Sequence, residues 1–310
     1  MNRAYIKSKM PRWVMNIYIR FSLVKRRLFK SVVLIKLKKL FQKEIEAANN
    51  GCLCEEYEAG NAHINDSKII PIWICWWQGL DKAPDLVKMC VNSIVKKMPS
   101  DRVEIKLITT ENLEEYIVLP EYIKDKFDKG IIDYTHMSDI VRVALLYKYG
   151  GMWIDSTYFM ADEIDLDKII ELKFWTHWNS KIANKDFVTH GKWSCNLMYS
   201  EPGGIVPAFI LRCWYSYWEK MNKLIDYQVF DYIIRIGYEE VSVIKEMITR
   251  CPQSEPNLFE LQGVMNKEFD ENKWHNLLEN TNLFKLSYKK DYILKTSDGK
   301  MTFWGYLVSQ

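Results

Sequence analysis

The chain has 310 residues, of which 48% are hydrophobic, 14% aromatic and 27% charged. This balance is typical of a globular protein with a large core, and it excludes a disordered chain, a collagen-like repeat and a small disulfide scaffold. The net charge of +3 is unevenly distributed. Residues 1–43 carry 13 Lys or Arg and no acidic residue, whereas residues 44–310 carry 30 basic and 40 acidic residues. We expect no nucleic-acid partner for this acidic body, because phosphate binding needs a positive surface.

The cysteine pattern and the lengths of the apolar stretches predict the cellular compartment. There are seven cysteines, an odd number, and none form a Cys-x-x-Cys pair. We therefore expect neither a disulfide framework nor a zinc site, and a cytoplasmic location. The sequence shows no secretory signal and no stretch of about 18 apolar residues that could span a bilayer.

The basic N-terminal arm, residues 1–45, is predicted to contain an amphipathic helix. Val24, Leu28, Val32 and Ile35 recur at steps of three or four, and the basic residues fall mostly off that stripe. Such a helix can bind an anionic membrane surface, to which each nearby basic residue contributes on the order of 1 kcal/mol. The alternatives are a helix that packs on the rest of the chain and a helix that binds a partner.

The body, residues 65–310, is predicted to be one domain of alternating strands and helices. The apolar run 69–77 is typical of a buried strand. Pro84 begins a helix that Pro99 ends. The next elements are a strand at 103–109, a short helix capped by Thr110, a helix from Pro120 to about Lys129, a helix from about Ser138 to Gly150-Gly151, a strand at 152–154, mainly helix from about 205, and a hairpin around 297–299. This order indicates an α/β fold with a mostly parallel central sheet wrapped by helices.

Asp155 directly follows the predicted strand 152–154, together with Ser156 and Thr157. Open α/β sheets bind ligands beyond the carboxyl ends of their strands, so these side chains lie where a site is expected. Oxygen ligands suit Mg²⁺ or Mn²⁺, and such an ion can stabilise a departing diphosphate. Taken alone, the triplet is more typical of a turn or helix cap.

Asp139 and Arg142 lie three residues apart and so share one face of a predicted helix. The simplest interpretation is a surface ion pair. The functional alternative is a pair that binds sugar hydroxyls and a phosphate, for which the forked guanidinium is suited.

Separated motifs resemble the bacterial capsular polysaccharide synthesis protein family, glycosyltransferases of GT-A fold with a DXD sugar-binding motif, related to glycosyltransferase family 32. They are IPIWICWWQG at 70–79, THMSDIVR at 135–142 and GGMWIDST at 150–157, and the resemblance extends over residues 65–310. It implies that the body has a GT-A-like nucleotide-diphospho-sugar transferase fold, preceded by the basic helix and ending in a helical C-terminal part.

The resemblance also implies roles for individual residues. Asp139 and Arg142 would bind the donor sugar and its phosphate, and Asp155 would bind the metal or the ribose. Trp77 would stack on the nucleobase, with core packing as an equal alternative. Thr157 would complete the donor site, but it stands where the wider superfamily has a second Asp. Because a hydroxyl brings no charge to a divalent ion, the implied Mn²⁺ or Mg²⁺ rests on Asp155 unless another carboxylate completes the site.

Asp226 and Asp231 are candidates for that further carboxylate and for a catalytic role, with helix capping or surface charge as the alternative. Asp165 and Asp167 form a literal Asp-x-Asp, but they open a predicted helix, where acidic residues are expected. The aromatic stretch 175–193 either forms an acceptor surface or packs in the core.

Together these features predict a glycosyltransferase, hexosyltransferase-like and metal-assisted. It would transfer a sugar from a nucleotide-sugar, a UDP-sugar by resemblance, to a growing capsular or other cell-surface polysaccharide or lipid-linked glycan. Residues 1–43 would hold it on the inner face of the plasma membrane as a peripheral protein. The alternatives are a non-catalytic nucleotide- or glycan-binding protein of the same fold, which Thr157 favours, and a membrane-docked assembly factor.

Overall fold

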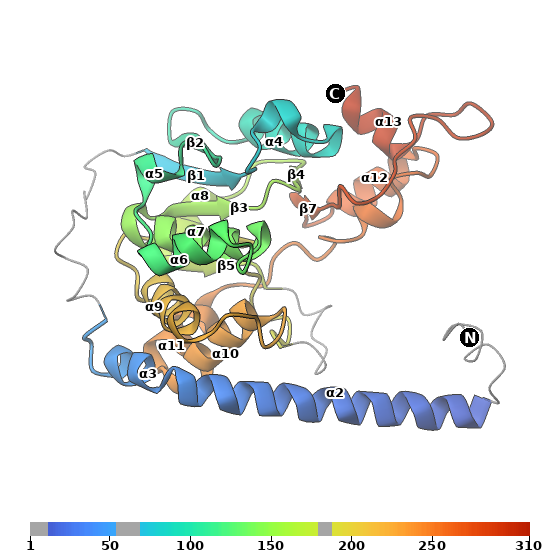
Figure 1. The fold of residues 1–310 in the computed structure, drawn as a ribbon. Coiled ribbons are helices and arrows are strands. Elements are labelled where there is room, and N and C mark those ends of the chain that lie inside the picture. The colour runs from blue at the N-terminus through green and yellow to red at the C-terminus, as the bar shows by residue number, and fades with distance from the viewer. Residues whose placement is uncertain (1–11, 54–68, 179–187) are drawn as a thin grey trace.

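The computed structural model describes residues 12–53, 69–178 and 188–310, with residues 12–23 described by their backbone alone. At its centre lies a sheet with the strand order β2-β1-β3-β6-β5 (Figure 1). The strands are β1 (Ile70–Cys75), β2 (Val103–Ile108), β3 (Gly151–Ile154), β5 (Phe174–Thr176) and β6 (Leu197–Ser200). β1 is parallel to β2 and β3, and β6 is antiparallel to β3 and β5, so only β6 of these strands runs in the opposite direction. The prediction of an α/β fold with a mostly parallel sheet is confirmed.

Helices cover the sheet in the order that the sequence predicts. α4 (Asp85–Lys97) lies between Pro84 and Pro99, and α6 (Glu121–Asp128) begins after Pro120. α7 (Tyr134–Tyr149) packs on β1, β3 and β6, and α9 (Ile205–Lys220) packs on α7. The other helices of the body are η1 (Leu80–Lys82), α5 (Leu113–Tyr116), α8 (Leu166–Glu171), α10 (Val229–Glu240) and α11 (Ser242–Arg250).

Two helix starts differ from the prediction. α7 begins four residues before Ser138, because Asp133 caps it and accepts a hydrogen bond from the His136 N–H at 2.9 Å. Thr110 does not cap α5; its hydroxyl donates to the Trp77 carbonyl instead. Asp133, Thr135 and His136 are polar, so apolar periodicity does not mark this start.

A smaller C-terminal unit stands beside the main sheet (Figure 1). In it β4 (Tyr158–Met160) pairs antiparallel with β7 (Leu283–Lys285), so that Tyr158 lies opposite Lys285. Around this pair lie η3 (Leu261–Gly263), α12 (Glu271–Leu278) and α13 (Phe303–Val308), which share a second hydrophobic core. Lys295 and Met301 form an antiparallel bridge around the expected turn at 297–299. This unit thereby brings residues near position 285 next to the chain that follows β3.

The predicted basic helix is present as α2 (Arg12–Leu40), followed by α3 (Gln42–Asn49). Its C-terminal part packs on α10, while its N-terminal part extends past the body (Figure 1). Val33, Leu37 and Phe41 are buried in the main core. No helix in the described ranges is both long enough and apolar enough to cross a membrane.

Candidate functional site

A cavity of about 770 Å³ lies at the carboxyl ends of β1 and β3. It is lined by the segments that follow β1, β3 and β7, by the segments that precede β6 and α10, and by residues of α7 and α10. This is the place where open α/β sheets bind ligands. The cavity brings together most of the candidate residues of the sequence, namely Trp77, Asp139, Arg142, Asp155, Thr157 and Asp231. Asp226 is not among its lining residues.

Asp155 is positioned by a close approach of β3 to β1. Gly150 ends α7 and Gly151 begins β3, with φ angles of 66° and 90°. A Cβ atom on Gly151 would lie only 2.1 Å from the Pro71 carbonyl oxygen of β1, so no larger residue fits there. At the far end of β3, the Asp155 N–H donates to the Asn196 carbonyl at 3.0 Å. The carboxylate therefore leaves the sheet at a fixed point.

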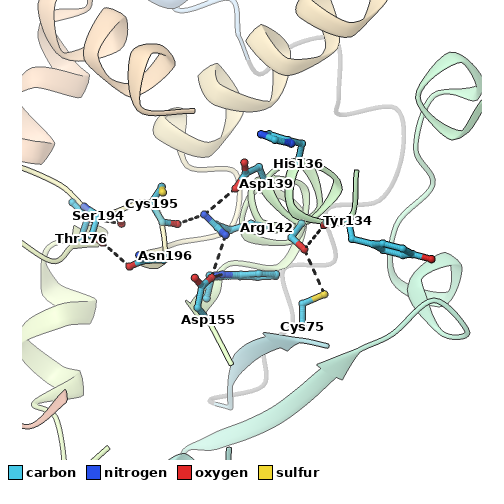
Figure 2. Close-up of polar contacts among 12 residues, drawn as sticks. Cys75, Tyr134, His136, Asp139, Arg142, Asp155, Thr176, Ser194, Cys195 and Asn196 are labelled. Atoms are coloured by element: carbon cyan, nitrogen blue, oxygen red, sulfur yellow. Dashed lines mark hydrogen bonds and ion pairs between the residues drawn. The ribbon is translucent and has the colours of Figure 1, made fainter. Parts of the chain in front are cut away.

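Arg142 lies between the carboxyl groups of Asp139 and Asp155 and contacts both (Figure 2). Its Nη1 lies 3.4 Å from Asp139 Oδ1, and its Nη2 lies 3.2 Å from Asp155 Oδ1. Nη1 also donates to the Cys195 carbonyl. The guanidinium carbon lies 4.9 Å from the ring centre of Trp153, and the side chain is only 5% exposed. Asp139 and Arg142 are thus a buried pair at the cavity and not the surface ion pair that was the simplest interpretation.

The carboxyl groups of the cavity differ in pKa. Burial raises the pKa of Asp139 to about 7, although Arg142 opposes the rise. Burial also raises the pKa of Asp231 to about 6. Burial alone would raise the pKa of Asp155 too, but the charges of Lys285 and Arg142 outweigh it and lower that pKa. Perturbed carboxyl groups in a cavity are typical of a functional site.

Sequence reasoning missed Lys285, which lies in the middle of this cluster. Its Nζ is 2.8 Å from Asp155 Oδ2 and 2.7 Å from Thr157 Oγ1. The register of β4 with β7 places it opposite Tyr158, and Nζ lies 4.9 Å from the centre of the Tyr158 ring. The nearby sequence offered only a run of lysines at 285, 289 and 290 as a signal.

The side chains around Asp155 do not fit a divalent metal ion. Asp155 Oδ1 accepts from Trp153 Nε1 at 2.8 Å and from Arg142, and Oδ2 accepts from Lys285. Thr157 brings no charge, and its hydroxyl also accepts from Lys285. Within the described ranges, no three His, Cys, Asp or Glu side chains form a group that could hold a metal. A hard cation prefers several free oxygen ligands, and this cluster offers it an ammonium group instead.

Trp77 lies at the cavity but is largely covered. Its Nε1 donates to the Tyr134 carbonyl and to Ser138 Oγ, both at 2.9 Å. Its ring packs against the rings of Phe127 and Tyr134. Tyr134 is half exposed and lines the same wall, so it offers a more open ring to a planar ligand than Trp77 does.

The two candidate carboxylates of the 226–231 segment have different surroundings. Asp226 accepts a hydrogen bond from the Gln228 N–H at 2.8 Å in the turn before α10, but it does not cap that helix. Asp231 lines the cavity, and its carboxyl is buried beside Trp193. Of the two, Asp231 is the one available to a ligand.

Other expectations from the sequence are also resolved. Asp165 caps α8, as predicted for the literal Asp-x-Asp, and Asp167 pairs with Arg102 at the surface. Trp175, His177 and Trp193 of the aromatic stretch are buried, and burial lowers the pKa of His177 to about 4. These side chains therefore pack in the core; residues 179–187 of the stretch lie outside the described residues.

Comparison with known proteins gives one family. A family model described as capsular polysaccharide synthesis protein matches residues 21–306, which include part of α2 and the whole cavity. No curated protein and no solved structure matches the chain.

Proposed function

The chain belongs to the capsular polysaccharide synthesis protein family, which suggests a role in capsule biosynthesis, and from this premise we propose that it is a GT-A-like glycosyltransferase. The observation that carries the proposal is the linked set Asp139–Arg142–Asp155 in a cavity at the carboxyl ends of β1 and β3. The donor we propose is a nucleotide-sugar, with UDP-sugars as the first choice. The acceptor is a growing capsular or other cell-surface polysaccharide or a lipid-linked glycan.

The reaction requires a site that binds a sugar and a diphosphate. Transfer breaks the bond between the anomeric carbon and a diphosphate oxygen, and the electron pair stays on the diphosphate. The acceptor hydroxyl forms the new bond to carbon and releases its proton to the departing diphosphate or to water. Asp139 and Asp231 have carboxyl oxygens suited to sugar hydroxyls, and Asp155 is the ionised centre that Arg142 holds in place.

We also propose that α2 holds the enzyme on an anionic membrane surface. Val24, Leu28 and Ile35 are exposed on the side of α2 away from the buried Val33 and Leu37, and Phe29 and Val32 are exposed as well. Lys25, Arg26 and Arg27 lie in the same part of the helix, and no acidic residue occurs in 1–43. Apolar side chains among cations suit an anionic bilayer surface, where a lipid-linked acceptor would be within reach.

The first test uses the full chain with a panel of nucleotide-sugars and measures release of the free nucleoside diphosphate, with and without Mn²⁺. Asp155→Asn removes the ionised centre at constant volume, and we expect it to lower release by about a hundred-fold or more. Asp167→Asn, the same change on an exposed acid outside the cavity, is the matched control and should keep the wild-type rate.

Each outcome has a distinct meaning. Release from one donor that is lost only in Asp155→Asn supports the transferase. Binding of a nucleotide-sugar without any release, also with glycan acceptors present, would favour the non-catalytic binding protein. A folded protein that neither binds nor cleaves any donor contradicts the proposal.

A further inference from the structure

The position of Lys285 is informative because it competes with a metal ion. Its ammonium lies within 2.8 Å of Asp155 Oδ2 and 2.7 Å of Thr157 Oγ1. These are the two side chains that an ion at the 155–157 motif would need as ligands. An ion bound to the same two oxygens would occupy the space of the ammonium and would be repelled by its charge.

The local charge balance is consistent with an ammonium. A motif with two carboxylates carries two negative charges, which a divalent cation neutralises. Asp155 beside Thr157 carries one negative charge, and two cations, Lys285 and Arg142, already lie against it. With Thr157 in place of a second carboxylate and with Lys285 present, the local charge does not call for a divalent cation.

Lys285 is also held in place and has a donor to spare. The side chain is 18% exposed and lies against the Tyr158 ring, which limits its movement. An ammonium has three N–H donors, and two of them have acceptors among the described residues. The third can serve a ligand in the cavity that Lys285 lines.

Arg142 is the more enclosed of the two cations, with a side chain that is 5% exposed against 18% for Lys285. Its terminal nitrogens donate to the Cys195 carbonyl and to Asp155, and its plane lies near Trp153 and Phe230. Arg142 is therefore a positioning residue for Asp155, and Lys285 is the cation of the cluster that a phosphate can reach.

We propose that Lys285 takes the place of the divalent ion, so that this chain binds the diphosphate of its donor through an ammonium and needs no metal. The inference rests on the proposed function, because it assumes a nucleotide-diphosphate donor. When the bond to the anomeric carbon breaks and its electron pair stays on the diphosphate, the ammonium of Lys285 stabilises that charge and keeps its own proton.

The first experiment needs only the metal. Electron paramagnetic resonance of Mn²⁺ mixed with the full chain separates free from bound ion. We expect the wild-type protein to leave Mn²⁺ free. The double variant Thr157→Asp/Lys285→Gln has two carboxylates and no ammonium, and we expect it to bind Mn²⁺ at least about ten-fold more tightly. Thermal melts verify that each variant is folded.

The second experiment measures UDP and UMP binding by calorimetry, in EDTA and in Mn²⁺. We expect wild-type affinity for UDP to be the same in both, and Lys285→Gln to weaken UDP about ten-fold or more while changing UMP little, since UMP lacks the second phosphate. Lys290→Gln removes the same charge from an exposed residue outside the cavity lining and is the matched control.

The results separate this inference from the proposed function. Wild-type UDP binding that requires Mn²⁺, or UDP affinity unchanged by Lys285→Gln, overturns the inference and leaves the transferase standing. Tight Mn²⁺ binding by the wild-type protein without nucleotide also overturns it. Failure to bind or cleave any donor overturns the proposed function and with it the role of Lys285 toward a diphosphate, whatever the Mn²⁺ measurement gives.

Discussion

Asp139 is a buried carboxyl group whose surroundings change its pKa. Burial raises the pKa of its carboxyl to about 7, although Arg142 Nη1 lies 3.4 Å away. In the unfolded chain the pKa of an aspartate is near 4. Between these two values the folded protein binds more protons than the unfolded one, so the free energy of unfolding decreases as pH rises from about 4 to about 7.

This environment predicts that Asp139→Asn stabilises the free protein more at pH 8 than at pH 5. At pH 5 the folded carboxyl is neutral but the unfolded one is mostly ionised, so the variant should be more stable by only about 1 kcal/mol. At pH 8 the wild-type protein carries the cost of a buried charge, and the variant should be more stable by about 2–4 kcal/mol. Urea unfolding of the unliganded full chain at both pH values measures the difference.

Asp167→Asn provides the comparison, because Asp167 is exposed and its pKa is lowered by the hydrogen bond from Arg102. Its effect should be small and equal at pH 5 and pH 8. A stability difference for Asp139→Asn that is the same at the two pH values would contradict the assigned environment. If the same variant gains stability and loses donor binding, then Asp139 serves ligand binding at a cost in stability.

At the scale of the elements, the turn between α7 and β3 fixes the position of Asp155. Gly151→Ala would place a Cβ 2.1 Å from the Pro71 carbonyl at a positive φ of 90°, so β1 and β3 would have to separate. We expect a loss of about 3 kcal/mol or more in the free energy of unfolding. The variant should also bind nucleotide more weakly, because the shift of β3 displaces Asp155. Chemical unfolding and calorimetry measure the two effects.

The control for this turn is Gly263→Ala. A Cβ on Gly263 would meet no atom within 4 Å, and this glycine lies in the short helix η3, outside the turn between α7 and β3. Its substitution should change stability by less than about 1 kcal/mol. Equal effects of the two substitutions would mean that the close approach at Pro71 has no energetic consequence.

The sequence predicted the elements well where local rules decide. The buried strand β1, the helices bounded by Pro84, Pro99 and Pro120, and the glycine end of α7 all follow from periodicity and from proline and glycine chemistry. The position of Asp155 followed from strand order alone. Lys285 could not be predicted, because only the pairing of β7 with β4, more than a hundred residues apart, brings it to the motif.

The burial of individual side chains could not be predicted from the sequence either. Asp226 and Asp231 are five residues apart and had equal standing, but one accepts a hydrogen bond within a turn and the other has a buried oxygen in the cavity. Trp77 likewise combines both of its interpretations, since it lines the cavity and packs against Phe127. Such distinctions depend on the neighbours that the fold supplies.

For the whole molecule, α2 has two apolar sides with different surroundings. Val33 and Leu37 are buried on the body, and Lys38 forms ion pairs with Glu239 and Glu240 of α10 at 2.8 and 2.5 Å. On the other side, Leu28 and Ile35 are 63% and 66% exposed. The body therefore holds the helix in place while leaving the stripe that the sequence predicted open to solvent.

This arrangement predicts that the full chain binds vesicles containing phosphatidylglycerol and not vesicles of phosphatidylcholine alone. Flotation at low ionic strength measures binding, and added salt should weaken it because the basic residues of α2 supply part of the attraction. Leu28→Glu/Ile35→Glu should reduce binding about ten-fold or more, because it replaces apolar contacts with charges of the same sign as the lipid. Both positions are exposed, so the thermal melt should hardly change.

Val118→Glu tests whether any exposed valine has the same effect, since Val118 is exposed in the segment between α5 and α6, away from α2. It should bind vesicles as the wild-type protein does. Equal binding to neutral and anionic vesicles, or no effect of the double substitution, would contradict a membrane role for this face. A change in oligomeric state on Leu28→Glu/Ile35→Glu, without any vesicle binding by the wild type, would assign the face to a second copy of the chain.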